Sequence, residues 1–336
     1  MSGNSLIGLL NVDPARFDDP AKTRGLFEGQ KASRYRDLLT EKNRLISAYC
    51  HASTYADDLT ALRDQIDTQK ADAYAALNDI LLDDFGALRI KYEQAQASGK
   101  TLKRPVALAD IQALDPFHWG YEFDEIIGTR GGFDVIITDP PWETFKPQSK
   151  EFFAVYSDIV TKNKMDIKEF EAEQERLLAN PEVNRAWLEF QSRYPHVNLC
   201  YRNSPQYKNQ MAYVDGKKIT TDINLYKLFL EQCYNLLRPT RQCGIVIPSG
   251  IYTDLGAKQL RELLFEATQI TGLFGFENRR EIFEGVHRSF KFVALTFAPG
   301  SVPKFTHILS TFPLVSGDVK QAALAAFRAV EGGLLK

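Results

Sequence analysis

The sequence predicts an α/β protein in which an open sheet follows a helical segment and is interrupted by a helical insertion. Three observations support this class. Apolar residues recur at helical spacing from Ala32 to Gly99, short apolar runs typical of buried strands begin at Phe133, and strand and helix patterns alternate from there to Phe297. The expected divisions are residues 1–115, a core at 116–300 with an insertion at 143–221, and a tail at 301–336.

Composition restricts the class of protein further. A chain of 336 residues suits one large domain or two modest ones, and 44% hydrophobic with 25% charged residues excludes wholesale disorder. No run of about 18 apolar residues occurs, so no membrane span and no membrane partner are expected. The first residues lack a basic region followed by an apolar stretch, so no secretory signal is expected either.

Charge and cysteine usage restrict the nucleic-acid binding, the metal sites and the compartment that can be expected. The formal net charge of −2 argues against a protein that grips nucleic acid through global electrostatics alone. The four cysteines form no C-x-x-C pair and the five histidines form no H-x-x-x-H pair, so no metal site is expected. Widely spaced cysteines suit a reducing compartment, and a cytoplasmic location is expected.

The helical segment comes first along the chain. Two sets of apolar residues each share one helical face and predict a helical hairpin that covers a sheet or forms a subdomain. Partner docking or a coiled coil is the alternative, but no sustained heptad supports it. The two sets are Leu59, Leu62 and Ile66, and Ala73, Leu77, Ile80 and Leu81.

Four strand-like runs follow, with helix patterns between them. The first run is expected to be covered on both faces because it is almost wholly apolar. Asp222 is a candidate cap for the first helix, and Thr253 or Asp254 for the second. The order strand, helix, strand, helix, strand, strand predicts parallel crossovers with one antiparallel strand. The runs are residues 133–138, 243–248, 271–276 and 291–297.

The stretch at 143–221 breaks this alternation. Two helices are expected in it, the second starting at Asn180-Pro181 and burying Val183, Trp187 and Phe190. A long insertion directly after the carboxyl end of a strand is where α/β proteins build their sites. The insertion also contains a lysine cluster among aromatic residues: Lys146, Lys150, Lys162, Lys164 and Lys168.

The motif Asp139-Pro140-Pro141-Trp142 stands at that strand end. It resembles the fourth motif of amino-methyltransferases that use S-adenosylmethionine, [Asp/Asn/Ser]-Pro-Pro-[Tyr/Phe/Trp]. The alternative is an ordinary turn that ends a strand, and the position at the carboxyl edge of a buried strand favours the catalytic interpretation.

Each residue of the motif suits methylation of an exocyclic amine, whose lone pair is delocalised into the ring. The Asp139 carboxylate and the Pro140 main-chain carbonyl can accept the amine N–H bonds and stabilise the charge that develops during transfer. Consecutive prolines fix φ and restrict the preceding residue, which holds both acceptors in place. Trp142 offers a flat face on which an extruded base can stack.

The flanking sequence resembles large DNA adenine-N6 methyltransferases of restriction-modification systems of the type IIG kind, and related phage-defence proteins. The resemblance extends over residues 117–297 apart from the insertion and rests on Phe117-His118-Trp119, Asn224–Phe229, Gly244–Ser249 and Glu277–Phe292. It implies part of a Rossmann-like S-adenosylmethionine-dependent methyltransferase sheet, with an N-terminal helical segment and a helical insertion after the catalytic strand.

The same resemblance implies the site residues. Asp139, Pro140, Pro141 and Trp142 would be catalytic. Asn4, Leu225 and Phe229 would bind S-adenosylmethionine, and Lys146, His287, Arg288 and Phe290 would bind substrate. A polar turn at His287-Arg288, a simple N-terminal turn at Asn4 and core packing by the phenylalanines are the alternatives.

One expected motif is missing. No G-x-G turn for the methionine part of the cofactor occurs between Met1 and Trp142, whereas Gly3-Asn4 resembles the third motif of the family. The chain is therefore expected to be part of a larger enzyme, without the glycine motif and without the target-recognition domain to which residues 301–336 would lead.

The implied reaction is methyl transfer from S-adenosylmethionine to adenine N6 in double-stranded DNA, with the adenine flipped out of the helix. The expected partners are DNA, the remaining N-terminal part of the enzyme, and a nuclease or helicase. Two alternatives stay open, which are methylation of RNA or of a protein glutamine, and a catalytically inactive nucleic-acid-binding subunit.

Overall fold

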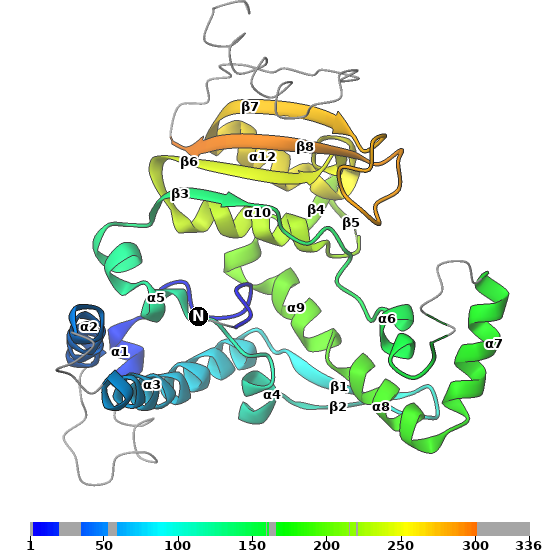
Figure 1. Cartoon of the computed structure of the whole chain (residues 1–336), viewed down its shortest axis with the longest axis horizontal. Helices are drawn as coiled ribbons and strands as arrows, with labels where there is room; N and C mark the ends of the chain where they lie inside the picture. The colour runs from blue at the N-terminus through cyan, green and yellow to red at the C-terminus, as the bar shows by residue number, and fades with distance from the viewer. Residues whose placement is uncertain are drawn as a thin grey trace, which may run out of the picture. The chain divides into compact units, whose positions relative to one another are not determined.

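The computed structural model describes residues 3–19, 35–52, 59–158, 160, 166–214, 216–219 and 221–300 (Figure 1). The expected tail at 301–336 and the lysines Lys162 and Lys164 lie outside these residues. The chain forms two compact units. The first is drawn from residues 1–87, 106–134 and 236–238, and the second from residues 88–105, 135–235 and 239–336.

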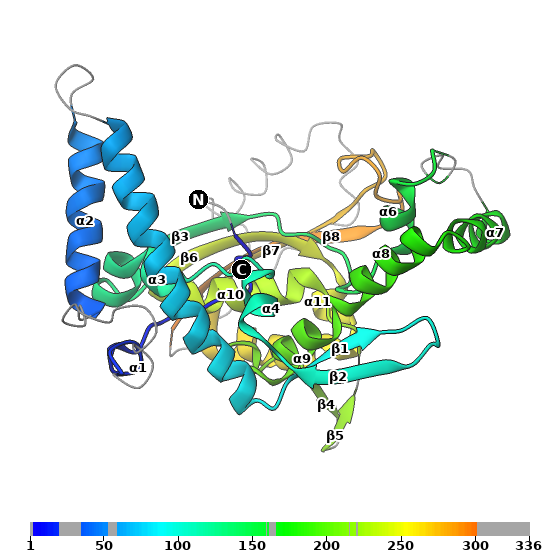
Figure 2. The ribbon, with the colours of Figure 1, turned by 90° about the horizontal axis from the view of Figure 1, so that it is seen from below.

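A helical hairpin dominates the first unit. Helices α2 (Tyr35–His51) and α3 (Leu59–Ala87) lie side by side, as Figure 2 shows. Both predicted apolar sets lie on α3: Ala73, Leu77, Ile80 and Leu81 are buried, whereas Leu59, Leu62 and Ile66 are half-buried. The remaining helices of the unit are short: α1 (Pro14–Phe17), α4 (Leu108–Gln112), α5 (Trp119–Glu122) and a π-helical turn at Glu125–Thr129.

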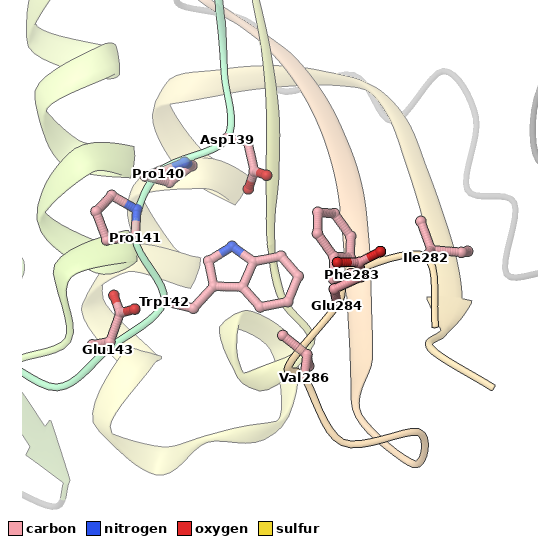
Figure 3. Close-up of a pocket in the computed structure, with 9 residues that line it drawn as sticks. All are labelled: Asp139, Pro140, Pro141, Trp142, Glu143, Ile282, Phe283, Glu284 and Val286. Carbon is pink, nitrogen blue, oxygen red and sulfur yellow. The ribbon is translucent and has the colours of Figure 1, made fainter. Parts of the chain in front are cut away.

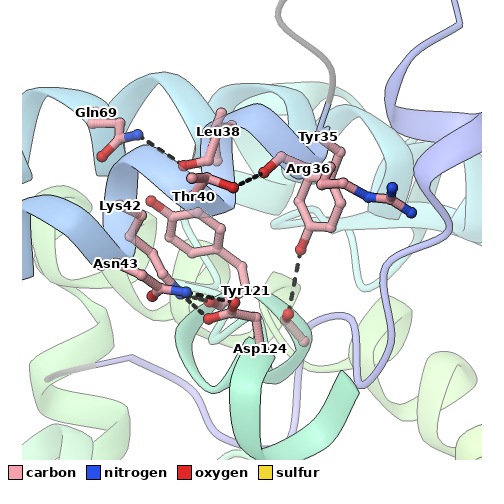
Figure 4. Close-up of polar contacts among 10 residues, drawn as sticks. Tyr35, Arg36, Leu38, Thr40, Lys42, Asn43, Gln69, Tyr121 and Asp124 are labelled. Carbon is pink, nitrogen blue, oxygen red and sulfur yellow. Dashed lines mark hydrogen bonds and ion pairs between the residues drawn. The ribbon is translucent and has the colours of Figure 1, made fainter. Parts of the chain in front are cut away.

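A buried cation joins the hairpin to the segment that leads into the sheet (Figure 4). Lys42 of α2 is only 4% exposed, and its Nζ donates to the Tyr121 carbonyl and forms an ion pair with Asp124. Asn43 Nδ2 donates to the second carboxylate oxygen of Asp124 at 2.9 Å. A buried charge needs such partners, since burial without them is costly. Here Lys42 is a hydrogen-bond donor to both the Tyr121 carbonyl and the Asp124 carboxylate, and these two groups are its partners.

A buried histidine anchors the amino-terminal segment to the same unit. His118 Nδ1 accepts the Leu9 N–H at 3.3 Å, so Nε2 carries the proton and donates to Asn78 Oδ1 at 3.1 Å. Burial is the main cause that lowers the pKa of His118 to about 4, with the charge of Lys70 adding to it. Gly8 passes so close that a Cβ there would lie 2.1 Å from the Phe117 carbonyl oxygen. Residues 3–9 are therefore packed against residues 115–118.

The second unit is built on a mixed four-stranded sheet of order β3-β6-β8-β7 (Figure 1). Strand β8 is antiparallel to both of its neighbours, so β6 and β7 run in the same direction and α12 (Lys258–Ala267) connects them. This arrangement confirms the predicted α/β class with one antiparallel strand. The strands are β3 (Phe133–Thr138), β6 (Leu237–Pro248), β7 (Thr268–Glu277) and β8 (Lys291–Pro299).

Strand β3 differs from the prediction that both of its faces are covered. Val135 is 58% exposed and Ile137 is 84% exposed, while Ile136 and Thr138 on the other face are half-buried. The reason is that β3 is an edge strand that pairs with β6 alone, and within the described part of the chain nothing packs over the Val135 and Ile137 face.

Both predicted helix caps are also wrong. Helix α10 (Leu225–Leu236) begins directly after Asn224, whose carbonyl accepts the N–H groups of Lys227 and Leu228, and Asp222 lies outside it. Helix α12 begins at Lys258 because a 3₁₀ turn at Leu255–Ala257 separates it from Asp254.

The insertion has a hydrophobic core of its own. Phe153, Phe170, Leu177, Val183 and Trp187 pack together, and Asn180 caps α8 by accepting the Glu182 N–H at 2.9 Å. Phe190, expected to be buried, is half-buried against this core. The structure contains more elements here than the two expected helices: α6 (Ser149–Ala154), α7 (Ile167–Leu178), α8 (Pro181–Ser192), α9 (Pro195–Asn203), β4 (Ala212–Val214) and β5 (Lys217–Ile219).

A β-hairpin that the sequence did not predict packs against this insertion. Strands β1 (Lys91–Ala95) and β2 (Thr101–Pro105) pair antiparallel, and the Ala95 N–H donates to Ser192 Oγ at 2.9 Å. The turn between the strands contains Gly99 at φ +74, which favours glycine. Across the described ranges, no helix combines the length and the apolar character that crossing a membrane requires.

Candidate active site

The Asp139–Trp142 loop leaves the carboxyl end of β3 and runs between β6 and the start of α10. The Trp142 indole N–H donates to the Val246 carbonyl of β6 at 3.3 Å. On the other side, the Leu225 N–H donates to the Glu143 carbonyl at 3.0 Å and the Phe145 N–H to the Ile223 carbonyl at 2.7 Å. These contacts hold the carboxyl end of the loop, and β3 leads into its amino end, so the motif is fixed at the edge of the sheet.

The loop forms one wall of a cavity of about 520 Å³ (Figure 3). The facing wall comes from the segment between β7 and β8, more than 130 residues later in the chain. Carboxylates are the only charged side chains among its described lining residues. The lining is Asp139, Pro140, Pro141, Trp142 and Glu143 on one side, and Ile282, Phe283, Glu284 and Val286 on the other.

Aromatic rings surround Trp142. Phe290 stacks on the indole with an interplanar angle of 14° and ring centroids 5.6 Å apart. Phe283 and Phe292 contact it at 4.8 Å and 5.9 Å in tilted orientations. The sequence predicts that one of Phe283, Phe290 and Phe292 lines the target pocket. Phe283 lines this cavity, whereas Phe290, the predicted substrate residue, contributes through its stacking on Trp142. The site is therefore an aromatic cluster around Trp142 next to a carboxylate.

The Asp139 carboxylate is directed into the cavity (Figure 3). Desolvation raises its pKa above the ordinary aspartate value, and the nearby Trp142 indole N–H acts in the opposite direction. A carboxylate with a raised pKa is a stronger proton acceptor than an ordinary one. The group can thus accept the N–H bonds of an amine held against Trp142.

The other predicted substrate residues make local contacts. Lys146 lies 3.9 Å from Asp222 in an exposed ion pair. Arg288 Nε donates to Glu281 at 2.8 Å, and His287 Nδ1 lies 2.8 Å from Ser289 Oγ. His287 and Arg288 are exposed and belong to the segment between β7 and β8, so the structure places them on the loop that carries Phe283 without lining the cavity.

The predicted cofactor residues fall into two groups. Leu225 and Phe229 lie one turn apart on α10, both half-buried, and the Leu225 N–H donates to the Glu143 carbonyl, next to the Asp139–Trp142 loop. Asn4 belongs to the first unit, where its Oδ1 accepts the Leu6 N–H at 3.2 Å. The apolar pair on α10 suits the uncharged part of a methyl donor. In the described ranges, no group of three or more His, Cys, Asp or Glu side chains is arranged to hold a metal ion.

A signal for the facing wall was present in the sequence. The family resemblance of Glu277–Phe292 implies that this segment closes the base pocket, with His287, Arg288 and Phe290 as its substrate residues. Two strand runs flanking a segment that contains Gly285 predict a loop at one end of the sheet. The roles of Ile282, Phe283, Glu284 and Val286 depend on where that loop folds, which the sequence pattern does not specify.

Comparison with known families matches part of this region. Residues 200–283 match the Eco57I restriction-modification methylase family. The match confirms the resemblance to restriction-modification DNA methyltransferases, and it covers α10, β6, β7 and the loop as far as Phe283. The Asp139–Trp142 motif lies outside the matched residues. No curated protein matches the chain.

Several solved structures resemble parts of the fold. A nuclease-deletion mutant of the Type ISP restriction-modification enzyme LlaGI, in complex with a DNA substrate mimic, is 15% identical over 63% of this chain and 17% of its own, with a TM-score of 0.32. A putative class I S-adenosylmethionine-dependent methyltransferase from Listeria monocytogenes is 9% identical over 94% and 96% of the two chains, with a TM-score of 0.29. The chain spans less than a fifth of the length of the LlaGI chain.

Proposed function

We propose that this chain carries the catalytic loop of a restriction-modification DNA methyltransferase that transfers a methyl group from S-adenosylmethionine to the N6 atom of adenine. The observation that carries the proposal is the joint placement of the Asp139 carboxylate and the Trp142 ring in one cavity at the end of β3. The family match over residues 200–283 supports it, because those residues supply part of the facing wall.

The cavity suits a single flat base. Its volume of about 520 Å³ falls within the roughly 300–1,000 Å³ of small-molecule sites. A base inside a duplex cannot reach such a cavity, so it has to be extruded and then stacked on an aromatic side chain. Trp142 and Phe283 offer the aromatic contacts, and the carboxylate lining favours a ligand edge that carries N–H donors.

Asp139 is the proposed hydrogen-bond and proton acceptor for the amine. Its carboxylate accepts one N–H bond and the Pro140 main-chain carbonyl accepts the other, which favours the pyramidal amine whose lone pair is free to attack. The donor, when bound, supplies an electrophilic methyl group. The positive charge that develops on nitrogen is stabilised by the adjacent carboxylate, which has a raised pKa and can take up the proton that leaves.

The donor site is proposed at Leu225 and Phe229, which present apolar surface beside the catalytic loop. The sequence contains no G-x-G turn to approach the charged methionine part. Double-stranded DNA and a nuclease or helicase are the proposed partners, with phosphate contacts outside the carboxylate-lined cavity.

The test uses the protein as it occurs in the cell, with S-adenosylmethionine carrying a labelled methyl group and duplex DNA of mixed sequence. Mass spectrometry of the digested DNA should find the label on adenine N6. Asp139→Ala and Trp142→Ala should each abolish labelling while the protein stays folded. Asp84→Asn is the matched control, because Asp84 pairs with Arg16 in the first unit at a position 38% exposed.

Three outcomes would contradict the proposal. Full labelling in both variants would remove Asp139 and Trp142 from the reaction. Label in RNA or on protein glutamine, with none in DNA, would assign a different substrate. DNA binding that weakens steeply with salt, without any methyl transfer, would identify a nucleic-acid-binding subunit.

A further inference from the structure

The wall of the cavity that faces Trp142 belongs to a loop that is mostly exposed. Residues 278–290 connect β7 to β8, and Glu281, Glu284 and Arg288 are among the exposed side chains. Phe283 and Val286 of this loop nevertheless line the cavity, and Phe283 contacts the Trp142 ring. Exposed loops are ordinarily the least constrained parts of a fold, so specific interactions are needed to fix Phe283 and Val286 at the cavity.

One buried side chain organises the loop. Asn278, the residue after β7, is 0% exposed. Its Nδ2 donates to the Phe283 carbonyl at 3.0 Å and to the Val286 carbonyl at 2.8 Å, and its Oδ1 accepts the Phe283 N–H at 3.0 Å. The side-chain amide therefore pairs with both main-chain groups of Phe283, as a neighbouring strand would.

The backbone of Asn278 adds two further contacts. Its N–H donates to the Phe290 carbonyl and its carbonyl accepts the Glu281 N–H, both at 2.9 Å. An asparagine side chain has two donors and an acceptor oxygen, and here both donors and the oxygen are used. Aspartate has the same shape but, when ionised, only acceptors, so it would oppose two carbonyl oxygens in a buried position.

We propose that Asn278 is a positioning residue for the base cavity, which holds Phe283 and Val286 against Trp142. The inference rests on the proposed function for the identity of the ligand but not for the geometry. Without the amide, the Phe283 N–H loses the acceptor at Asn278, and the Phe283 carbonyl keeps only the Val286 N–H at 3.4 Å, so the aromatic wall is less firmly fixed relative to Asp139.

Fluorine NMR of the whole chain labelled with 5-fluorotryptophan tests the geometry in the absence of substrate. The sequence contains three tryptophans, Trp119, Trp142 and Trp187, and Trp142→Phe identifies the resonance of interest. Asn278→Asp should shift or broaden the Trp142 resonance and leave the other two unchanged. An unchanged Trp142 resonance would overturn the proposal.

Two further variants guard against a general loss of stability. Asn78→Ala removes another buried asparagine, the partner of His118, and should leave Trp142 unchanged. Glu281→Gln breaks the exposed ion pair with Arg288 on the same loop and should also leave it unchanged. If Asn278→Asp unfolds the chain, all three resonances will collapse together, and Asn278→Ala, which introduces no buried charge, becomes the deciding variant by the same criterion.

Kinetics of the intact enzyme separate positioning from chemistry. Asn278→Ala should raise KM for DNA about tenfold or more, as expected when a buried hydrogen-bonded wall loses its partner. The value of kcat should change little, because Asp139 and Trp142 remain. A fall in kcat with unchanged KM would contradict a positioning role. If the wild-type protein methylates nothing while Trp142 still responds to Asn278, the proposed function fails and the proposed role of Asn278 stands.

Discussion

Replacing Lys42 with methionine tests whether the buried ion pair with Asp124 holds α2 against the chain that leads into β3. The lysine side chain is 5% exposed and the aspartate 13%. Methionine keeps the length and the apolar stem of lysine but removes the charge and the donors to Tyr121 and Asp124. The variant therefore leaves a buried carboxylate with a single amide partner, Asn43.

The size of the effect follows from this geometry. Removing one partner of a buried ion pair costs about 3–5 kcal/mol, because the remaining charge is left uncompensated. The hydrogen bond from Asn43 at 2.9 Å offsets part of this, so the expected loss is about 3 kcal/mol. At about 2–4 °C per kcal/mol for a unit of this size, the melting temperature should fall by about 6–12 °C.

Thermal and urea unfolding of the whole chain provide the measurement. Arg63→Met is the matched control, because Arg63 also lies on a helix but pairs with Asp67 at 3.9 Å with both side chains about two-thirds or more exposed. Such surface pairs are worth about 0.5 kcal/mol. The double variant Lys42→Met with Asp124→Leu should recover most of the stability, since no charge then remains buried.

A loss below about 1 kcal/mol for Lys42→Met, or one equal to that of Arg63→Met, would refute the reasoning. So would a double variant that is less stable than the single one. Either result would mean that Asp124 is solvated in the absence of the lysine and that the packing of α2 does not depend on this contact.

Three further predictions concern the site and the first unit. Trp142→Ala should weaken capture of an extruded base by about 1–3 kcal/mol, measured by DNA titration, while Trp142→Phe should retain most of the affinity. The rate of methyl transfer should decline as the pH falls. Desolvation raises the pKa of Asp139, so this decline should begin above the ordinary aspartate pKa. Asp139→Asn should abolish the activity and with it this pH dependence. Burial lowers the pKa of His118 to about 4 in the folded chain, against about 6.5 in the unfolded chain. As the pH falls, the unfolded chain takes up the proton first. The free energy of unfolding should therefore decline between about pH 6.5 and pH 4, by up to about 3 kcal/mol. Denaturation of His118→Gln should show a flatter pH dependence.

The sequence predicted the sheet well where burial is continuous. The runs that became β6, β7 and β8, and the apolar stripes of α10 and α12, are local patterns that stay the same whatever surrounds them. The sequence-based prediction was wrong where the burial or pairing of a strand depends on the segments that pack against it. Val135 and Ile137 look like core residues but lie on an exposed face of an edge strand, and Lys91–Ala95 became a strand because Thr101–Pro105 and the insertion pack against it.

The same division applies to the site. Asp139–Trp142 is a contiguous motif and could be recognised by itself, whereas its facing wall is brought close only by the pairing of β7 with β8. Asn278 lies within the segment that carries the family resemblance, but the sequence does not predict its role, because the pattern does not show whether an asparagine is buried. Its contacts with residues 283 and 286 depend on a loop conformation that includes Glu281 at φ 51 and Gly285 at φ 77, which no periodicity encodes.

The lining of the cavity has a consequence for the design of inhibitors. Asp139, Glu143 and Glu284 supply its only described charges, and all three are carboxylates. A phosphorylated compound would bring negative charge next to them, whereas a nucleoside or a neutral heterocycle would not. Competitive ligands for this site should therefore be flat, uncharged or cationic, and equipped with N–H donors along one edge.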